Sequence, residues 1–524
     1  MGKKDKKKGK GAEKTIAKTE KKAAQKLKKT LAAKGEDDIQ KLISQFVEQG
    51  RRRLPVSEEL VEPPSFRSGA TLCAHPEKEQ LLLFGGEYYN GLKTFMYNEL
   101  YLYNIKKNNW LLVKCPNPPP PRCAHQAMAV PQGGGQMWLF GGEFASPTRS
   151  QFYHYKDLWV YHLASRSWEQ VHAPGGPSAR SGHRMVQLGR RLIVFGGFHE
   201  SIRDYHYFND VYSFDLDERK WTKMEPVNAG PCPRSGCQMF AMSDDRIVVY
   251  GGYSREKLKK DVDHGVGHTD MYILHLDSGA PGKCKWAPVK QTGARLGPRS
   301  GLSTASVPQA NRAYLFGGVQ DEEDEEALEG RFFNDLHQLE LDRGHWRLVQ
   351  LRGESRDRGA KDGQLKEDME EEAEEGIHRL SIREPVVTSD DGVFTVTIGA
   401  SKGKTSGQDE ACAGATASEP AKDVSVPIAR MGCCMVVKHS ILYLYGGTFE
   451  DGDRQFTLSD MYALDTHKLD QWKVLVPLDT KTQEWLGSDE SDDEDSDDDD
   501  DDDDSDEDME ADDDGDGQSK DEAD

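Results

Sequence analysis

A double glycine preceded by four apolar residues recurs six times in this 524-residue chain, and this repetition limits the possible folds more than any other feature. The six phrases are LLLFGG, MWLFGG, LIVFGG, IVVYGG, AYLFGG and LYLYGG. Their glycines are Gly85, Gly86, Gly141, Gly142, Gly196, Gly197, Gly251, Gly252, Gly317, Gly318, Gly446 and Gly447. A phrase that returns in this way predicts a repeat architecture rather than one isolated loop.

Each glycine pair lies within a longer unit, called here a repeat and numbered one to six in chain order. An arginine near the start of each repeat precedes the first glycine by 16 to 19 residues. These arginines are Arg67, Arg122, Arg180, Arg234, Arg299 and Arg430. After the pair comes an acidic residue followed by an apolar and usually an aromatic residue, at Glu99, Asp157, Asp210, Asp270, Asp335 and Asp460. A tryptophan ends each repeat, at Trp110, Trp168, Trp221, Trp286, Trp346 and Trp472.

The apolar runs inside a repeat have the length and composition of β-strands, and glycine, proline and charged clusters separate them. Four runs fit in each repeat: after the arginine, before the glycine pair, through the acidic–aromatic step and at the tryptophan. About 50 residues with four strands are typical of a propeller blade. We therefore expect an all-β protein with a six-bladed β-propeller of four-stranded antiparallel blades.

The glycine pair could be a phosphate-binding loop or a structural turn. A phosphate-binding loop needs a helix that begins beside it, whereas a polar loop and another strand follow each pair here. We therefore expect the glycines to end the second strand where the backbone must turn close to its neighbours. The closing tryptophan and the aromatic residue of the third strand are expected to pack between successive blades.

Together, the glycine pair, acidic residue, aromatic residue and tryptophan resemble the kelch repeat, from residue 63 to about 478 apart from one insertion. Blades one to five correspond to residues 63–353 and blade six to residues 427–478. The resemblance implies a propeller, in a family defined by its repeats rather than by an established activity. Kelch propellers often close by sharing a blade between the chain ends, so the mode of closure stays open here.

Three segments lie outside the expected blades. Residues 1–62 are a lysine-rich head, expected to be disordered except for a short amphipathic helix over residues 39–54 that could dock on the propeller. One side of this helix carries Leu42, Ile43, Phe46 and Val47. Residues 354–426 are an acidic and polar insertion, expected to be mostly disordered, although GVFTVTIGA could add a strand. Residues 479–524 are an acidic tail, also expected to be disordered.

The formal net charge of −23 originates in this tail, because residues 488–524 hold 25 acidic residues and one lysine. Such a polyanion is expected to attract basic proteins, for example histones or ribosomal proteins. Ser491, Ser496 and Ser505 match the pattern that acidophilic kinases favour, so they are candidate phosphorylation sites. The 13 lysines of residues 1–30 indicate nuclear import or nucleic-acid contact, or else a solubilising tail.

Composition also indicates the compartment. No run of about 18 apolar residues is present, so we expect no membrane span, and the lysine-rich start lacks the apolar region of a secretory signal. The nine cysteines form no C-x-x-C and suit a reducing compartment. We expect an intracellular protein of the nucleus, the cytoplasm or both, with no membrane partner.

The segments between each glycine pair and the third strand are long and rich in aromatic, arginine, histidine and glutamate residues. Exposed aromatic residues on a rigid scaffold suit protein recognition, so these segments are the candidate partner-binding face. The alternative is that many of the rings pack loop against loop. The candidate residues are Glu87, Tyr88, Glu143, Phe144, Tyr153, His154, Phe198, His199, Arg203, Tyr205, His206, Tyr253, Arg331, Phe332, Phe449 and Arg454.

The sequence shows no Ser-His-Asp order, paired catalytic carboxylates or phosphate cradle, so we expect neither an enzyme nor a cofactor. His125, His183 and Cys237 occupy equivalent positions in repeats two to four and could converge on a soft metal. Strands near a propeller channel often carry such residues as ordinary core, and no carboxylate pattern supports such a site. We therefore expect no metal.

Three functions fit these observations. The first is a non-enzymatic adaptor whose propeller loops bind a protein partner. The second is a substrate receptor of a cullin-type ubiquitin ligase, as some kelch proteins are, for which PLDTKTQEWL is the one degenerate adaptor-box-like phrase. The third is an assembly factor or chaperone that binds basic ribosomal or chromatin proteins through the charged tails.

Overall fold

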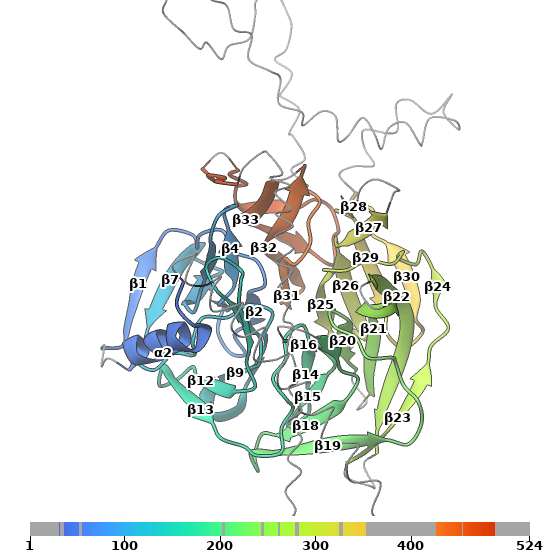
Figure 1. Ribbon diagram of the computed structural model, residues 1–524. Helices are drawn as coiled ribbons and strands as arrows, with labels where there is room; N and C mark the ends of the chain where they lie inside the picture. Colours follow the sequence, from blue (N-terminus) through green and yellow to red (C-terminus); the bar gives the residue numbers. More distant parts are fainter. Residues whose placement is uncertain are drawn as a thin grey trace, which may run out of the picture. The chain divides into compact units, whose positions relative to one another are not determined.

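The computed structural model describes residues 31, 36–51, 55–201, 205–242, 246–259, 262–277, 282–323, 328–352, 426–452, 454–480 and 482–487. Nearly all of the regular structure in these residues is β-strand, and the sheets follow one another around the propeller in chain order (Figure 1). The predicted all-β propeller class is therefore confirmed. The insertion's GVFTVTIGA segment, Arg203 and the three candidate phosphorylation sites lie outside the described residues.

Each of the first two repeats folds into antiparallel strands that neighbour one another in chain order. Repeat one contains β2 (Thr71–Ala74), β3 (Gln80–Phe84), β6 (Leu100–Asn104) and β7 (Asn109–Lys114), and β1 (Ser57–Val61) adds a fifth strand beside β7. Repeat two contains β8 (Gln126–Val130), β9 (Gln136–Phe140), β12 (Leu158–His162) and β13 (Ser167–Val171), with the 3-10 turn η1 (Gln132–Gly134) between β8 and β9. These are the four strands that the apolar runs predict.

Repeats three and four join into one eight-stranded sheet through a short parallel pairing of β19 with β23. Repeat three contributes β14 (Arg184–Leu188), β15 (Arg191–Phe195), β18 (Val211–Asp215) and β19 (Lys220–Pro226). Repeat four contributes β20 (Gln238–Ala241), β21 (Arg246–Lys259), β22 (Val262–Leu276) and β23 (Lys283–Pro288). Because strand pairing does not separate these two repeats, the number of six blades stays a prediction.

The last two repeats form separate sheets. Repeat five contains β25 (Ser303–Val307), β26 (Arg312–Phe316), β29 (Leu336–Glu340) and β30 (His345–Leu348), with η2 (Pro308–Ala310) between its first strands and β24 (Thr292–Gly293) parallel to β30. Repeat six contains β31 (Cys434–Lys438), β32 (Ile441–Asp451), β33 (Arg454–Asp465) and β34 (Lys473–Val476).

The segments after the glycine pairs are not irregular loops, as the sequence suggested, but two-stranded hairpins. Four are separate sheets: β4 (Glu87–Tyr89) with β5 (Thr94–Met96), β10 (Glu143–Ala145) with β11 (Phe152–His154), β16 (Phe198–Glu200) with β17 (Tyr205–Tyr207), and β27 (Val319–Glu323) with β28 (Leu328–Phe332). In repeats four and six the hairpin is the outer part of β21–β22 and β32–β33. In these two repeats each strand continues through the glycine region into the hairpin, and the pairing of the two strands shifts register at the glycine pair.

The closing tryptophan of each repeat packs on an aromatic ring of the preceding repeat, with ring centroids 4.8 to 6.1 Å apart. The pairs are Trp168–Phe84, Trp221–Phe140, Trp286–Phe195, Trp346–Tyr250, Trp472–Phe316 and Trp110–Tyr445. The hydrophobic clusters accordingly combine residues of neighbouring repeats. Removing such a buried ring typically costs about 3–5 kcal/mol, so these rings contribute strongly to the cohesion between repeats.

Repeat one packs directly against repeat six, and we call this junction the seam. Besides the Trp110–Tyr445 ring contact, the Cys434 thiol donates to the Ala70 carbonyl at 3.2 Å, and the Lys438 ammonium donates to the His75 carbonyl at 2.7 Å. These contacts join the two ends of the repeat series by side-chain packing between complete sheets. Within the described residues, no strand is exchanged between the chain ends to close the propeller.

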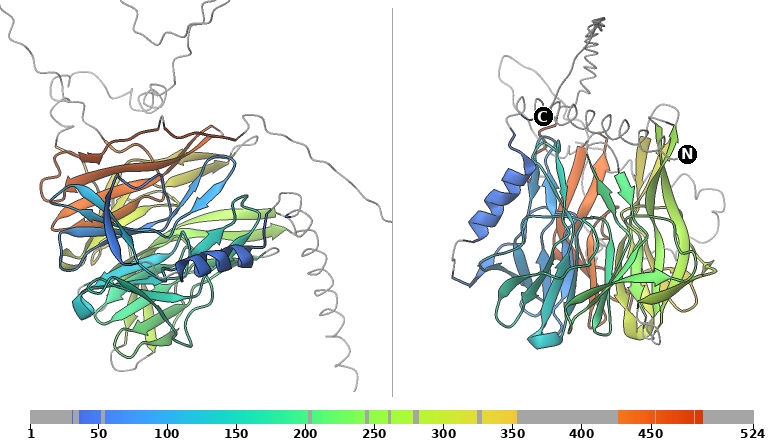
Figure 2. Two further views of the ribbon diagram at one scale, coloured as in Figure 1. Left: turned by 90° about the vertical axis from the view of Figure 1, so that its left-hand side faces the viewer. Right: turned by 60° about the horizontal axis from the view of Figure 1, so that its bottom comes forward.

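Helix α2 (Ile39–Gly50) lies against the outside of the propeller near repeats one and two (Figure 2). Asp38 caps its N-terminus, and Phe46 meets Phe144 of β10 with ring centroids 5.8 Å apart. The Asn117 N–H donates to the Gly50 carbonyl at 2.8 Å. The amphipathic segment is thus helical and docked, and no helix in the described ranges is both long and apolar enough to cross a bilayer.

Candidate protein-binding face

The arginine and the acidic residue of each repeat meet beneath the hairpins. In repeat two, Arg122 is buried and its Nη1 and Nη2 lie 2.7 and 2.9 Å from the carboxylate oxygens of Asp157. Nη1 also donates to the carbonyl of Gly141 at 3.0 Å. Burial alone would raise the pKa of Asp157, but the charge and hydrogen bonds of Arg122 lower it. The two side chains therefore form a buried ion pair that holds the start of the hairpin.

The same ion pair recurs in the other repeats, with closest N–O distances of 2.5 to 2.7 Å in repeats two to six. The remaining pairs are Arg180–Asp210, Arg234–Asp270, Arg299–Asp335 and Arg430–Asp460. In repeat one the distance from Arg67 to Glu99 is 3.6 Å. In the sequence alone these residues are separate landmarks, although an arginine and an acid that recur 30 to 36 positions apart are a usable signal of pairing.

Beside the ion pair, the glycine pair connects one repeat to the next. Gly141 and Gly142 have φ angles of 64° and 93°, and the Gly142 N–H donates to the carbonyl of Arg180 in repeat three at 3.0 Å. A Cβ at Gly142 would lie 2.7 Å from the Cys123 carbonyl oxygen. Both the left-handed conformation and the close approach require glycine. A β-hairpin rather than a helix follows, so the pair lacks the helix N-terminus of a phosphate-binding loop.

All six hairpins rise from equivalent positions and form what we call the hairpin face. The residue directly after each glycine pair bridges to the residue that follows the repeat's arginine, as in Ser68 with Glu87 and Ser181 with Phe198. Since the register is equivalent in every repeat, the hairpins belong to one end of the propeller. Neighbouring hairpins touch, including β5 with β10, β11 with β16, β28 with β32 and β4 with β33.

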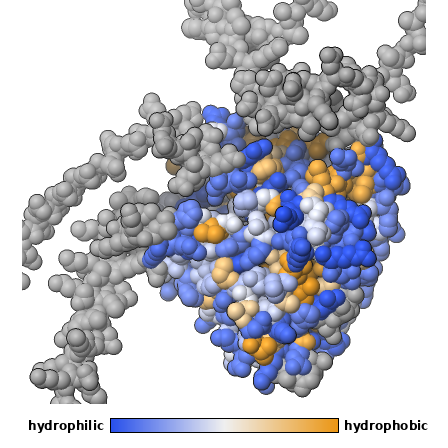
Figure 3. All heavy atoms as spheres, turned by 90° about the vertical axis from the view of Figure 1, so that its right-hand side faces the viewer, coloured by the Kyte–Doolittle hydropathy of each residue, from blue (hydrophilic) through white to orange (hydrophobic). Residues whose placement is uncertain are grey.

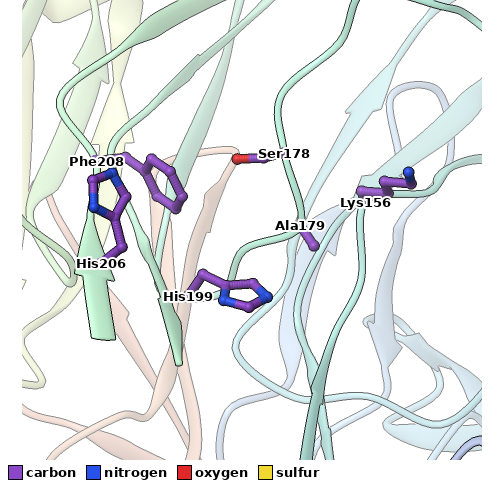
Figure 4. Close-up of a pocket in the computed structure, with 6 residues that line it drawn as sticks. All are labelled: Lys156, Ser178, Ala179, His199, His206 and Phe208. Carbon is purple, nitrogen blue, oxygen red and sulfur yellow. The ribbon is translucent and has the colours of Figure 1, made fainter. Parts of the chain in front are cut away.

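A groove of about 410 Å³ opens on the hairpin face between repeats two and three (Figure 4). Its lining residues are Lys156, Ser178, Ala179, His199, His206 and Phe208. Figure 4 shows the His206 and Phe208 rings on one side and Lys156, Ser178 and Ala179 on the other, with His199 near the opening between them. The groove thus combines an ammonium group, two imidazoles, a hydroxyl and one aromatic ring.

The imidazoles of this groove adjoin a half-buried polar cluster. The ring of His199 lies 4.8 Å from that of His154, and burial lowers the pKa of His154 to about 4. His154 Nε2 accepts a hydrogen bond from the Glu200 N–H at 3.1 Å, which leaves its Nδ1 facing Glu143 Oε2 at 3.6 Å. Burial, with Glu87 and Glu200 nearby, raises the pKa of Glu143 to about 7, although Ser181 donates to its carboxylate at 2.6 Å.

The candidate partner-binding residues differ in accessibility. Phe144 and His154 are buried, and Phe144 is covered by Phe46 of α2. Half-buried side chains are those of Glu87, Tyr88, Glu143, Phe198, His199, Tyr205, Tyr253, Phe332 and Phe449. Exposed side chains are those of Tyr153, His206, Arg331 and Arg454.

Several of the rings stack within their own hairpins, which was the alternative that the sequence left open. Tyr88 stacks on Phe95, Phe198 on Tyr207 and Phe449 on Phe456, with centroids 5.8, 5.8 and 4.9 Å apart. These stacked pairs stabilise the hairpins.

The residues once considered for a soft metal lie in the core. His125 packs on Phe84, and His183 packs on Phe140, with ring centroids 5.5 and 5.2 Å apart. Burial lowers the pKa of His125 to about 3, so its imidazole is neutral. In the described part of the chain, no three His, Cys, Asp or Glu side chains gather as a metal-ligand group.

The side of the propeller that carries repeats four and five is mostly hydrophilic, with hydrophobic residues in separate clusters (Figure 3). Single exposed apolar residues are ordinary in proteins.

Comparison with known proteins fits this architecture. A family model described as "FBX42, beta-propeller domain" matches residues 67–286. Kelch domain-containing protein 3 of Rattus norvegicus is 27% identical over 235 residues, which cover 43% of this chain and 59% of that protein. By these matches the chain is similar to kelch-repeat β-propeller proteins. Since the match spans 59% of that relative's length, the relative's own activity does not transfer directly.

Two further relatives extend the kelch comparison. Host cell factor homolog hcf-1 of Caenorhabditis elegans is 28% identical over 268 residues, covering 46% of this chain and 30% of that protein. Leucine-zipper-like transcriptional regulator 1 of Pongo abelii is 27% identical over 416 residues, covering 77% of this chain and 43% of that protein. Kelch propellers generally mediate protein–protein interaction and are generally non-catalytic.

Proposed function

We propose that this kelch protein is a non-enzymatic adaptor that binds a protein segment through the hairpin face of a six-bladed propeller. Six blades are supported by the ion pair, glycine pair and inter-repeat tryptophan contact that recur in all six repeats. The contact between repeats one and six supports a closed arrangement. In this proposal the interior contacts keep the propeller rigid, and the hairpins bind the partner.

The groove between repeats two and three is the observation on which the adaptor proposal rests. Lys156, Ser178 and His206 are exposed, and the Phe208 ring is fixed by the Arg180 guanidinium, whose Cζ lies 3.9 Å from the ring centroid. A rigid aromatic wall beside hydrogen-bond donors suits a polar or acidic side chain presented by a partner. We propose His199 and His206 as the main partner-contacting residues of this groove.

The test is capture of partners by the tagged full chain from cell extract after chemical cross-linking. A His199→Ala/His206→Ala variant should recover the principal partner at least about tenfold less than the unaltered chain. His439→Ala/His467→Ala is the matched control, because both histidines are exposed and lie at the turns of repeat six away from its hairpin. Equal recovery by the groove variant and the control would refute the proposed site.

The same capture also separates the two alternative functions. Recovery of cullin or elongin subunits would favour a ubiquitin-ligase receptor. Recovery of histones or ribosomal proteins that is lost when residues 488–524 are removed would favour the assembly factor, because that segment holds 25 acidic residues. Contact of the lysine-rich head with nucleic acid and phosphorylation of the tail serines stay predictions.

A further inference from the structure

The segment of residues 482–487 lies across the hairpin face at the seam, and we call it the resident segment. The indole of Trp485 meets the ring of Tyr89 edge to face, with centroids 5.8 Å apart. The Leu486 N–H donates to the carbonyl of Asn90 at 2.8 Å. The resident segment is therefore held by both a side chain and the backbone of the β4–β5 hairpin in repeat one.

The resident segment also contacts repeat six. With its amide oriented so that both groups are satisfied, Gln483 donates to the Thr457 carbonyl at 3.0 Å and accepts from the Thr457 N–H at 3.2 Å. Thr457 belongs to β33, where it is paired with Thr448 on its other side. Gln483 thus satisfies an outward-facing backbone pair of repeat six, and the resident segment bridges the first and last repeats.

Burial alternates along the resident segment. Gln483, Trp485 and Gly487 are half-buried, whereas the intervening Thr482, Glu484 and Leu486 are exposed, Leu486 by 47%. A period of two is the pattern of an extended peptide with one face on its support. The seam therefore contacts two side chains of this segment, the amide of Gln483 and the indole of Trp485, which lie two residues apart.

The β4–β5 hairpin lies close against the resident segment. Gly91 has a φ of 89°, and a Cβ there would lie 2.4 Å from Gly487 N and 2.9 Å from Trp485 Cδ2. Beside the contact, Leu92 and Phe95 are 56% and 44% exposed. The seam therefore offers further apolar surface that the short resident segment does not cover, and a longer peptide could bury it.

From these contacts we propose that the seam is a peptide-binding site for an extended partner segment carrying Gln and Trp two residues apart. Residues 482–487 are its intramolecular ligand, which such a partner displaces. This inference deepens the proposed adaptor function, on which it rests, by naming a kind of partner segment. A tethered ligand competes at a high effective concentration, so displacement requires the partner to make additional contacts, for which Leu92 and Phe95 are available.

The test measures binding of a fluorescent peptide with the sequence DTKTQEWLG, residues 479–487, to the full-length chain by anisotropy. Trp485→Ala in the chain should free the seam and raise the affinity for this peptide by about tenfold or more. Leu486→Ala is the matched control and should leave the affinity as in the unaltered chain, because that side chain is exposed. An unchanged affinity for Trp485→Ala would overturn the inference.

Two further measurements test whether the peptide binds at the seam. A peptide with alanine in place of its tryptophan should bind the Trp485→Ala chain at least about tenfold more weakly, and equal binding would overturn the inference. Gly91→Val combined with Trp485→Ala should remove the gained affinity, since the side chain would occupy the position of the peptide backbone. Negative results in these measurements would leave histidine-dependent capture by the groove intact, so the inference and the proposed function can fail separately.

Discussion

The ion pairs, glycine pairs and tryptophan contacts inside the propeller, called here the framework, are alike from repeat to repeat, whereas the residues of the hairpin face vary. In the framework, five repeats place an arginine 2.5 to 2.7 Å from an aspartate. On the hairpin face, the residues directly after the glycine pairs are Glu, Glu, Phe, Tyr, Val and Thr. Because every repeat must pack on its neighbour, the framework is uniform. The fold does not constrain the hairpin residues in this way, so specificity can reside there.

Repeat one departs from the other repeats in its ion pair. Its acid is Glu99, whose side chain is 38% exposed and reaches Arg67 only at 3.6 Å, whereas Arg430 and Asp460 are both fully buried at 2.6 Å. Arg67 does keep the ring contact of the other repeats: its Cζ lies 4.3 Å from the Tyr97 centroid, as Arg122 and Arg180 lie over Tyr155 and Phe208. The weakest ion pair thus lies beside the seam.

The largest expected effect follows from this contrast. Asp460→Ala would leave Arg430 buried without its counter-charge and should lower the free energy of unfolding by about 3–5 kcal/mol. Glu99→Ala should cost about 1 kcal/mol or less, since its pair is longer and partly solvated. Chemical denaturation of both variants measures the difference. Equal losses would mean that burial does not distinguish repeat one from repeat six.

The glycine pair gives the next largest effect. Gly142→Ala combines a positive φ with a contact of 2.7 Å to the Cys123 carbonyl, and should cost about 2–4 kcal/mol. Gly175→Ala is the matched control: its φ is 82° but no atom lies within 4 Å, so only about 1 kcal/mol of strain is expected. Thermal unfolding compares them, and similar losses would show that the close approach to the Cys123 carbonyl is not what requires the glycine.

Features that recur were predictable from sequence, and those that depend on single non-local contacts were not. The four strands of each repeat and the inter-repeat role of tryptophans such as Trp286 follow from patterns repeated six times. The continuation of β21 and β32 through their glycine pairs depends on how those particular hairpins pair. The docking of Glu484 beside Tyr88 joins residues 396 positions apart, and no local pattern in such a polar segment announces it.

The candidate site was predicted only in outline. The sequence predicted loops after the glycine pairs, where the structure has hairpins, and contacts between the hairpins decide which side chains are accessible. Tyr153 is exposed while its neighbour His154 is buried, because the His154 ring packs on Phe198 and His199 of the next hairpin. That distinction depends on a contact between two repeats, which the sequence does not provide.

A smaller effect is expected at Glu143, where the free energy of unfolding should depend on pH. Burial raises the pKa of its carboxyl group to about 7 from 4.5, so between these values the folded state binds more protons than the unfolded state. The free energy of unfolding contributed by this group therefore falls as pH rises through the window. Glu143→Gln lacks the titration and should gain on the order of 1–2 kcal/mol relative to the unaltered chain between about pH 5 and pH 8.

Thermal unfolding at the two pH values checks the Glu143 prediction. Glu77→Gln is the control for removing a carboxylate, because Glu77 is an exposed residue in the turn between β2 and β3. A Glu143→Gln difference that is the same at both pH values would contradict the raised pKa.

The smallest expected effect concerns the groove itself. His206 is exposed, and its ring packs on that of Phe208, with centroids 4.6 Å apart. His206→Ala should therefore change the free energy of unfolding by no more than about 0.5 kcal/mol, as surface substitutions usually do. Denaturation curves of the variant and the unaltered chain measure this directly. A loss comparable to that of Asp460→Ala would make the hairpins part of the framework, and reduced partner capture by the groove variant could then reflect unfolding rather than recognition.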